Sequence, residues 1–257
     1  MPTLQTIRDC DPQGKKILLR VDFNVPQDEH GAITDDSRMT KAIPTINYLL
    51  EKGAKLIIMS HLGRPDGEVK EAMRLTPIAK HLEELLGKPV KKLDETIGEQ
   101  VKKEVEKLQN GEILMLENTR FYPGEESNDP VFTKELASLG DIFVSDGFGV
   151  SHRAHASTTG LATLLPAYAG FLIEKECAAL APLLNAPTQP FTLILGGAKI
   201  KDKIGMIDQF IGKAQNILIG GGLANTFIAA QGHEVGTSLC EKDKLDLANE
   251  LLKKATS

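Results

Sequence analysis

Residues 17–24, ILLRVDFN, join a short apolar run to a polar cluster, and the same arrangement recurs three times before residue 156. The later copies lie at residues 56–65, 113–120 and 142–155. Continuous apolar runs separated by helical segments are typical of a parallel sheet that is covered on both faces. If the four runs are parallel strands, their polar clusters lie along one edge of the sheet, where open α/β sheets bind ligands.

The polar clusters are rich in arginine. Arg64, Arg120 and Arg153 occupy equivalent places after three of the runs. A single surface arginine is usually a solvated charge, but three at one sheet edge predict a site for a small, multiply anionic molecule. Arg20 lies within a run, so we expect it to have a structural role. Arg38 lies off the strand pattern, and spacing alone does not mark it.

Other polar residues of these clusters have two interpretations each. Asp22 and Asn24 are either turn formers or groups that hydrogen-bond a ligand hydroxyl, and spacing does not separate the two. His61, His152 and His155 could suggest zinc, but no Cys, Asp or Glu completes a familiar ligand spacing around them. Anion contact or structural hydrogen bonding is favoured for the histidines.

Strand and helix signals alternate along the first 150 residues. They predict strands at 17–21, 55–60, 89–90, 112–117 and 142–146, and helices at 37–53, 75–86, 94–109 and 129–139. Pro44 falls inside the first of these helices, so that helix is expected to start late or to kink.

A connector follows. Residues 160–190 contain four prolines around a helical segment at 173–184, a composition that suits a link between domains. We therefore predict a domain at 1–168, an interdomain helix and hinge at 169–190, and part of a second domain at 191–257. The predicted fold class is α/β, with two doubly wound parallel-sheet domains. The second has only two clear strands, at 191–195 and 216–219, with helices at 202–213 and 241–254, so the natural polypeptide is expected to continue.

Two glycine clusters stand between strand and helix in the second part, at 196–199 (GGAK) and 220–222 (GGG). Glycine there permits close approach of a ligand to backbone N–H groups, and the helix N-terminus behind it favours phosphate. The alternative is that glycine only lets the helix pack on the strand. Either cluster alone leaves the choice even, while both together, with Lys199 and Lys203, favour phosphate. Neither cluster matches a Walker or Rossmann fingerprint.

Composition excludes several classes of function. The net charge of −5 argues against general nucleic-acid binding. No apolar run is long enough to span a bilayer, and the N-terminus lacks the pattern of a signal peptide. The three cysteines are far apart and lack metal-ligand or disulfide spacing, which favours a reducing cytosol. No motif indicates covalent catalysis.

The chain resembles the phosphoglycerate kinase family. The segments that match its N-terminal motifs are 20–26, 60–65, 116–121 and 152–155, and those that match its nucleotide-side motifs are 196–204 and 220–227. The sequence of residues 224–232 is similar to that of bacterial members of the family. Residues 145–151, SDGFGVS, depart from the commoner NDAFGTA, but the change leaves Arg153 in place.

The resemblance implies reversible phosphoryl transfer between 1,3-bisphosphoglycerate and ADP, giving 3-phosphoglycerate and ATP in glycolysis. The residues implied to hold 3-phosphoglycerate are Asp22, Asn24, Arg38, His61, Arg64, Arg120 and Arg153. Those implied to line the nucleotide site are Gly197, Ala198, Lys199, Lys203, Gly221 and Gly222. Arg38 and Lys199 are the implied catalytic residues, which stabilise the transferring phosphoryl group. A hinge would close the two domains.

The resemblance also sets expectations about cofactor and partners. Mg²⁺ is expected as its complex with ADP or ATP, with its protein ligand beyond residue 257 and no metal ligand in this chain. The family's last third is missing from this sequence, so we expect the chain alone to bind substrate without effective turnover. A cytoplasmic monomer that binds neither nucleic acid nor membrane is expected.

Two alternatives remain open. One is a truncated, non-catalytic 3-phosphoglycerate-binding module. The other is a different nucleotide-dependent α/β enzyme, such as a carboxylate kinase. The presence of both Arg38 and Lys199 favours the phosphoglycerate kinase, because a sensor would need neither.

Overall fold

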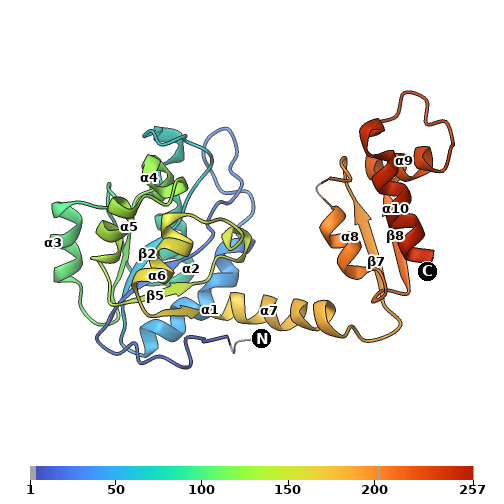
Figure 1. Cartoon of the computed structure of the whole chain (residues 1–257). Helices are drawn as coiled ribbons and strands as arrows, with labels where there is room; N and C mark the ends of the chain where they lie inside the picture. The colour runs from blue at the N-terminus through green and yellow to red at the C-terminus, as the bar shows by residue number, and fades with distance from the viewer. Residues whose placement is uncertain (1–3, 202, 257) are drawn as a thin grey trace. The chain divides into compact units, whose positions relative to one another are not determined.

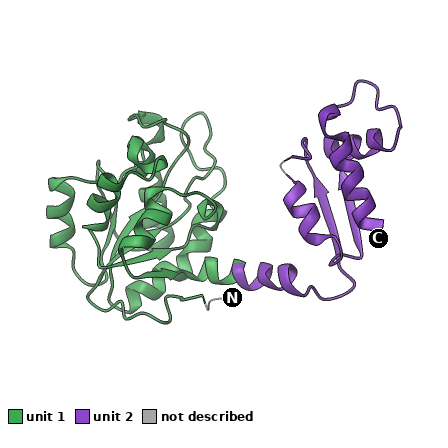
Figure 2. Cartoon of the chain, in the orientation of Figure 1, with its two compact units in different colours: residues 1–176 green, residues 177–257 purple. Residues whose placement is uncertain are grey.

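The structure is a computed structural model that describes residues 4–201 and 203–256, and it divides into two compact units (Figure 2). The first unit comprises residues 1–176 and the second 177–257. The division falls inside helix α7 (Phe171–Asn185), which lies where the sequence predicts the helix of the connector. Each unit is described below by itself.

A parallel sheet forms the centre of the first unit (Figure 1). Its described strands are β1 (Lys16–Arg20), β2 (Lys55–Met59), β3 (Val90–Lys92), β4 (Ile113–Met115), β5 (Ile142–Ser145) and β6 (Ala167–Ala169). They lie in the order β3-β4-β2-β1-β5-β6, and every neighbouring pair is parallel. The four predicted apolar runs are therefore four adjacent parallel strands, as expected.

Helices cover both faces of this sheet because successive strand residues point to opposite sides. Ile17 and Leu19 of β1 pack in one core with α1 (Ser37–Glu51) and α2 (Thr76–Leu86). Leu18 packs in the other core with α3 (Glu99–Lys107) and α5 (Pro130–Ala137). The short helical segments of this unit are η1 (Glu71–Met73), η2 (Thr119–Phe121), α4 (Pro123–Glu126), η3 (Phe148–Val150), η4 (Ala156–Gly160) and α6 (Leu161–Leu164). The arrangement confirms a doubly wound α/β unit.

Helix α1 begins at Ser37, as predicted, and continues through Pro44, so the late start that was one of the two expected effects of this proline is not found. Two other predictions for this unit are wrong. Helix α3 begins only at Glu99, because Gly98 before it has φ 110°, which is incompatible with a helix. Strand β6 lies in the stretch interpreted as connector, and the pattern rules did not find this three-residue element after Pro166.

The second unit has two described parallel strands, β7 (Thr192–Gly196) and β8 (Asn216–Gly220). Its described helices are α8 (Ile204–Phe210), α9 (Gly221–Ala230), η5 (Lys242–Lys244) and α10 (Leu245–Thr256). The predicted helix start at residue 202 lies outside the described residues. A small core joins Leu195 to Leu223, Phe227 and Leu251. Within the described residues of both units, no helix combines the length and apolarity needed to cross a membrane.

Candidate anion-binding site

The polar clusters predicted at the strand ends meet in one cavity of about 290 Å³ in the first unit. They follow β4, β2, β1 and β5, which are adjacent in the sheet, so their parallel carboxyl ends bring the loops together. The lining includes every residue predicted for this side: Asp22, Asn24, Arg38, His61, Arg64, Arg120 and Arg153. Gly63, Gly149 and Val150 also line it, and the sequence analysis did not single them out.

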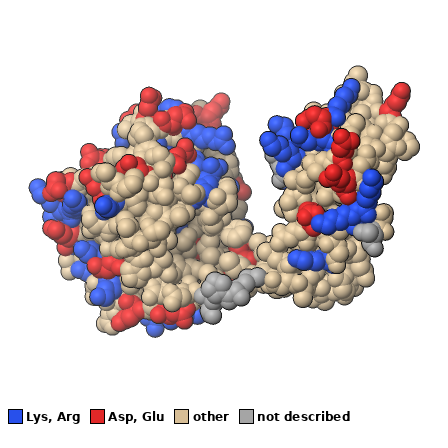
Figure 3. All heavy atoms as spheres, in the orientation of Figure 1, with Lys and Arg blue, Asp and Glu red and all other residues tan. Residues whose placement is uncertain are grey.

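The cavity is positively charged. Among its described lining residues are four arginines and one aspartate. Over the visible face of the first unit, Lys and Arg are interspersed with Asp and Glu (Figure 3). The whole chain has a net charge of −5, so the positive cavity belongs to an acidic protein. Guanidinium groups that converge in this way suit a ligand with several carboxylate or phosphate oxygens.

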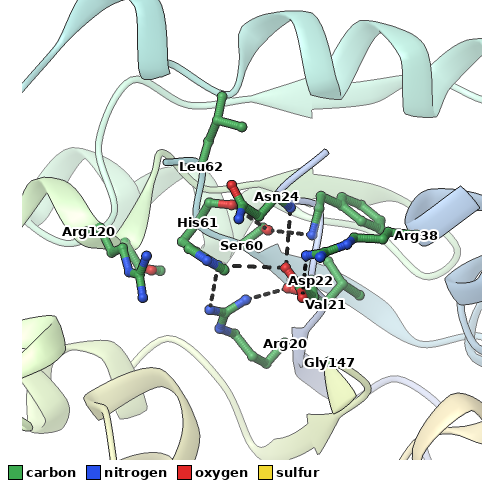
Figure 4. Close-up of polar contacts among 12 residues, drawn as sticks. Arg20, Val21, Asp22, Asn24, Arg38, Ser60, His61, Leu62, Arg120 and Gly147 are labelled. Atoms are coloured by element: carbon green, nitrogen blue, oxygen red, sulfur yellow. Dashed lines mark hydrogen bonds and ion pairs between the residues drawn. The ribbon is translucent and has the colours of Figure 1, made fainter. Parts of the chain in front are cut away.

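Asp22 organises one side of the cavity (Figure 4). Its Oδ2 lies 2.8 Å from Nη1 of Arg38, and its Oδ1 accepts a hydrogen bond of 3.3 Å from the backbone N of Asn24. The carboxylate thereby holds an exposed arginine of α1 at the cavity. The strand pattern does not predict Arg38 as a site residue. Arg38 lines the cavity because α1 begins directly after the loop that follows β1.

Three loops are tied together across the cavity by backbone contacts of Gly63. Its N–H donates to Oδ1 of Asn24 at 2.9 Å, and its carbonyl accepts from Nη1 of Arg120 at 2.9 Å. Gly63 has φ +65°, and an added Cβ would lie 2.8 Å from Sδ of Met73. The left-handed backbone conformation favours glycine here, and a side chain would also require Met73 to move.

Arg120 is presented by a capped turn. The side chain of Asn118 accepts from the backbone N of Arg120 at 3.1 Å, which starts η2. The guanidinium is buried and its Nε lies 2.8 Å from Oε1 of Glu126. Burial lowers the pKa of Arg120, and Glu126 opposes this effect. The hydrogen bond from Nη1 to the carbonyl of Gly63 fixes the direction of the guanidinium.

His61 is the buried imidazole of the cavity. Its Nδ1 lies 3.2 Å from Nη2 of Arg20, whose side chain is also buried. Burial lowers the pKa of His61 to about 2, with further contributions from Arg20, Arg120 and Arg153. His61 is therefore neutral. The contact with Arg20 joins the end of β1 to the loop that follows β2, and the sequence carried no signal for it beyond one arginine in an apolar run.

The other two histidines of the sequence analysis differ. The backbone N of His155 donates to Oγ1 of Thr158 at 3.1 Å in the turn that starts η4, which is a structural role. His152 is exposed. Among residues 4–201 and 203–256, no group of three or more His, Cys, Asp or Glu side chains could hold a metal ion.

The second unit brings its two glycine turns into contact. Leu223 N donates to the carbonyl of Gly197 at 2.8 Å. A Cβ at Gly221 would lie 3.1 Å from that carbonyl, and one at Gly222 would lie 3.1 Å from the carbonyl of Ala198. The glycines thus allow α9 to pack on the end of β7. Lys199 is exposed, and Lys203 immediately precedes α8.

A doubly wound parallel sheet with an arginine-lined cavity at its carboxyl edge defines the class of anion-binding α/β proteins. The sequence profile of the family described as phosphoglycerate kinase matches residues 7–257. The chain belongs to the phosphoglycerate kinase family.

Solved structures agree with this assignment. The chain is similar to phosphoglycerate kinase from Coxiella burnetii, with a TM-score of 0.86 and 36% sequence identity over 99% of this chain and 64% of that one. It is also similar to phosphoglycerate kinase from Pyrococcus horikoshii OT3, with a TM-score of 0.83 and 31% identity over 97% of this chain and 65% of that one. The chain thus spans a little less than two thirds of the length of these relatives.

Proposed function

We propose that the protein takes part in reversible phosphoryl transfer between 1,3-bisphosphoglycerate and ADP, giving 3-phosphoglycerate and ATP. The observation that carries this proposal is the cavity lined by four arginines at the ends of adjacent strands. 3-Phosphoglycerate carries a phosphate at one end and a carboxylate at the other, so it can engage several guanidinium groups at once.

Different cavity residues bind different groups of the ligand. Arg64, Arg120 and Arg153 bind its anionic ends. Asp22 and Asn24 recognise its hydroxyl. Because Oδ1 of Asn24 already accepts from Gly63 N, the NH₂ group of Asn24 is the one that donates to the ligand. This division explains why an aspartate belongs among the arginines, since a purely cationic wall would not distinguish a hydroxyl.

The nucleotide is proposed to bind at the glycine turns of the second unit, through Gly197, Ala198, Lys199, Lys203, Gly221 and Gly222. Backbone N–H groups at the start of α9 are suited to phosphate oxygens. Mg²⁺ bound with the nucleotide would neutralise phosphate charge. The described residues do not supply a ligand set for it, so no step is assigned to the metal.

Arg38 and Lys199 are proposed to stabilise the phosphoryl group during transfer. Such chemistry depends on alignment and charge neutralisation, and a positioned arginine contributes roughly 10³–10⁵ in rate in other phosphoryl-transfer enzymes. Because donor and acceptor would bind on different units, transfer requires the units to close around them and exclude water. A cytoplasmic monomer is part of the same proposal.

Calorimetric titration of 3-phosphoglycerate into the 257-residue chain tests the first half of the proposal. We expect Arg64→Ala to weaken binding at least tenfold. Arg8→Ala removes the same charge from an exposed side chain outside the cavity and should leave binding unchanged.

A coupled assay for ATP formation from 1,3-bisphosphoglycerate and ADP tests the second half, on the protein as its gene encodes it. Binding without any turnover would favour the non-catalytic 3-phosphoglycerate module. Absence of both would refute the proposal.

A further inference from the structure

Arg20 is a buried arginine that contacts His61, a residue of the cavity wall, and each of its three guanidinium nitrogens has a polar partner. Its Nε donates to Oγ of Ser157 at 2.8 Å, its Nη1 donates to the carbonyl of Val21, and its Nη2 lies 3.2 Å from Nδ1 of His61. Figure 4 shows the guanidinium and the imidazole pointing toward each other. A guanidinium has five N–H donors and no acceptor, so every partner of Arg20 must accept.

This requirement decides the state of His61. Its Nδ1 must carry a lone pair, and a neutral imidazole then has its proton on Nε2. The competing partner of Nδ1 is Oδ1 of Asp22, which lies 3.9 Å away, beyond hydrogen-bond distance. Asp22 is instead engaged by Arg38 at 2.8 Å.

We propose that Arg20 is a positioning residue that fixes His61 as the Nε2–H tautomer and so makes it a neutral hydrogen-bond donor to the anion in the cavity. The Nδ1 edge of the ring is occupied by Arg20, which leaves the Nε2 edge for the ligand, and His61 lines the cavity. The identity of that anion as 3-phosphoglycerate rests on the proposed function.

A buried carboxylate holds Arg20 in place. Glu125 of α4 is fully buried, and its Oε1 accepts from the hydroxyl of Ser157, which in turn accepts from Arg20. Oε2 of Glu125 accepts from the backbone N of Ser157 at 2.9 Å, and Thr119 donates to Oε1 at 3.2 Å. One hydroxyl therefore joins a buried cation to a buried anion, which fixes the guanidinium that faces His61.

The charge of the surroundings also keeps the ring neutral. The charged or titratable groups around His61 are Asp22, Arg20, Arg120, Arg153 and His155. Burial and these cations lower the pKa of His61 to about 2. The donor at Nε2 consequently does not change with pH between 5 and 8, and its tautomer is set by Arg20 rather than by the ligand.

The first test is a two-bond ¹H–¹⁵N correlation spectrum of the ligand-free chain labelled with ¹⁵N-histidine, and it needs no variant. We expect the signals of His61 to show a protonated Nε2 and an unprotonated Nδ1, without titration between pH 5 and 8. A protonated Nδ1, or a ring that becomes cationic in this range, overturns the proposal. This result is independent of whether the chain binds 3-phosphoglycerate.

The second test repeats the spectrum on Arg20→Lys, which keeps the charge but removes the planar fork. In a folded variant we expect His61 to show a mixture of tautomers. Unchanged His61 signals would show that Arg20 does not set the tautomer.

The third test needs only ligand affinity. The amide N of Gln reaches the position of Nε2, while that of Asn lies nearer to Nδ1. His61→Gln should therefore bind 3-phosphoglycerate at least tenfold more tightly than His61→Asn, a difference of about 1.4 kcal/mol. The reverse order refutes donation from Nε2. Failure of the wild-type chain itself to bind refutes the proposed function instead, and the spectra still decide the tautomer.

Discussion

The two units carry sites of different construction. In the first unit, side chains make the cavity and other side chains or carbonyls hold them, as in the 2.8 Å pair of Arg38 with Asp22. In the second unit, the backbones of the two glycine turns contact each other directly, as in the 2.8 Å hydrogen bond from Leu223 N to the carbonyl of Gly197. A cavity of the first kind is shaped by residue identity at many positions. A turn of the second kind depends on the absence of side chains.

The units also differ in how much polarity they bury. Arg20, His61, Glu125 and Asp146 of the first unit are buried, whereas Thr226 is the one buried polar residue among the described residues of the second unit. Buried ionisable groups make stability depend on pH, so the stability of the first unit should change more with pH than that of the second. The three tyrosines of the chain, Tyr48, Tyr122 and Tyr168, all lie in the first unit, and tryptophan is absent, so tyrosine fluorescence reports that unit alone.

The largest expected effect separates transfer from binding. Arg38→Ala should lower turnover by roughly 10³-fold or more, because an arginine that neutralises the transferring group acts mainly in the transition state. The affinity for 3-phosphoglycerate should fall much less, since three other arginines line the cavity. Coupled kinetics on the protein as encoded, together with calorimetry, measure the two quantities.

Arg64→Ala is the matched comparison for Arg38→Ala. It removes a second exposed cavity arginine that we assign to ligand binding, so its main effect should be on affinity. Equal losses of turnover and affinity in Arg38→Ala would remove Arg38 from the phosphoryl-transfer step.

The next effect concerns Asp146, which follows β5. Burial raises the pKa of Asp146 to about 6, and its Oδ2 has no hydrogen-bond partner among the described residues. The native state therefore favours the protonated acid. Its contribution to stability is complete below about pH 4 and is lost as the pH rises through 6, by up to about 3 kcal/mol for a shift of about two units.

Asp146→Asn tests this effect, because the amide keeps an acceptor for Leu172 N, which lies 2.9 Å from Oδ1. The stability of the wild-type chain relative to the variant should fall between pH 4 and 7, measured by urea unfolding with tyrosine fluorescence. His61 acts in the opposite direction, since its lowered pKa makes it lose stability as the pH falls below about 6.5, but it is common to both proteins and cancels. A difference that does not change with pH would contradict the expectation.

Much of the first site follows from one rule applied to sequence. Polar residues that follow parallel strands must share an edge, and this places Asn24, Arg64, Arg120 and Arg153 around one cavity. The rule does not apply to Arg38, because Arg38 lies in helix α1 rather than after a strand and is held at the cavity by Asp22. Only the family resemblance indicated Arg38.

The supporting contacts could not be predicted. Arg20 meets His61 because β1 and β2 pair in a particular register, and Glu125 meets Ser157 across 32 residues. Side-chain pairs of this kind depend on the packed structure and leave no local pattern. The predicted start of α3, residue 94, is wrong for a different reason. The helix is stopped by the positive φ of Gly98, a backbone conformation that the amino-acid composition does not indicate.

The smallest expected effect is in the second unit. Gly221 has φ +67°, and an added Cβ would lie 3.1 Å from the carbonyl of Gly197, so Gly221→Ala should destabilise this unit by about 1–2 kcal/mol. Gly220→Ala is the control, because its added Cβ meets no atom within 4 Å, and we expect a change below about 0.5 kcal/mol. Hydrogen exchange of residues 216–230 should report the loss in Gly221→Ala, while the tyrosine transition of the first unit stays in place. If both glycine variants behave alike, the turn tolerates a side chain, and the contrast between a site built from side chains and one built from backbone does not hold.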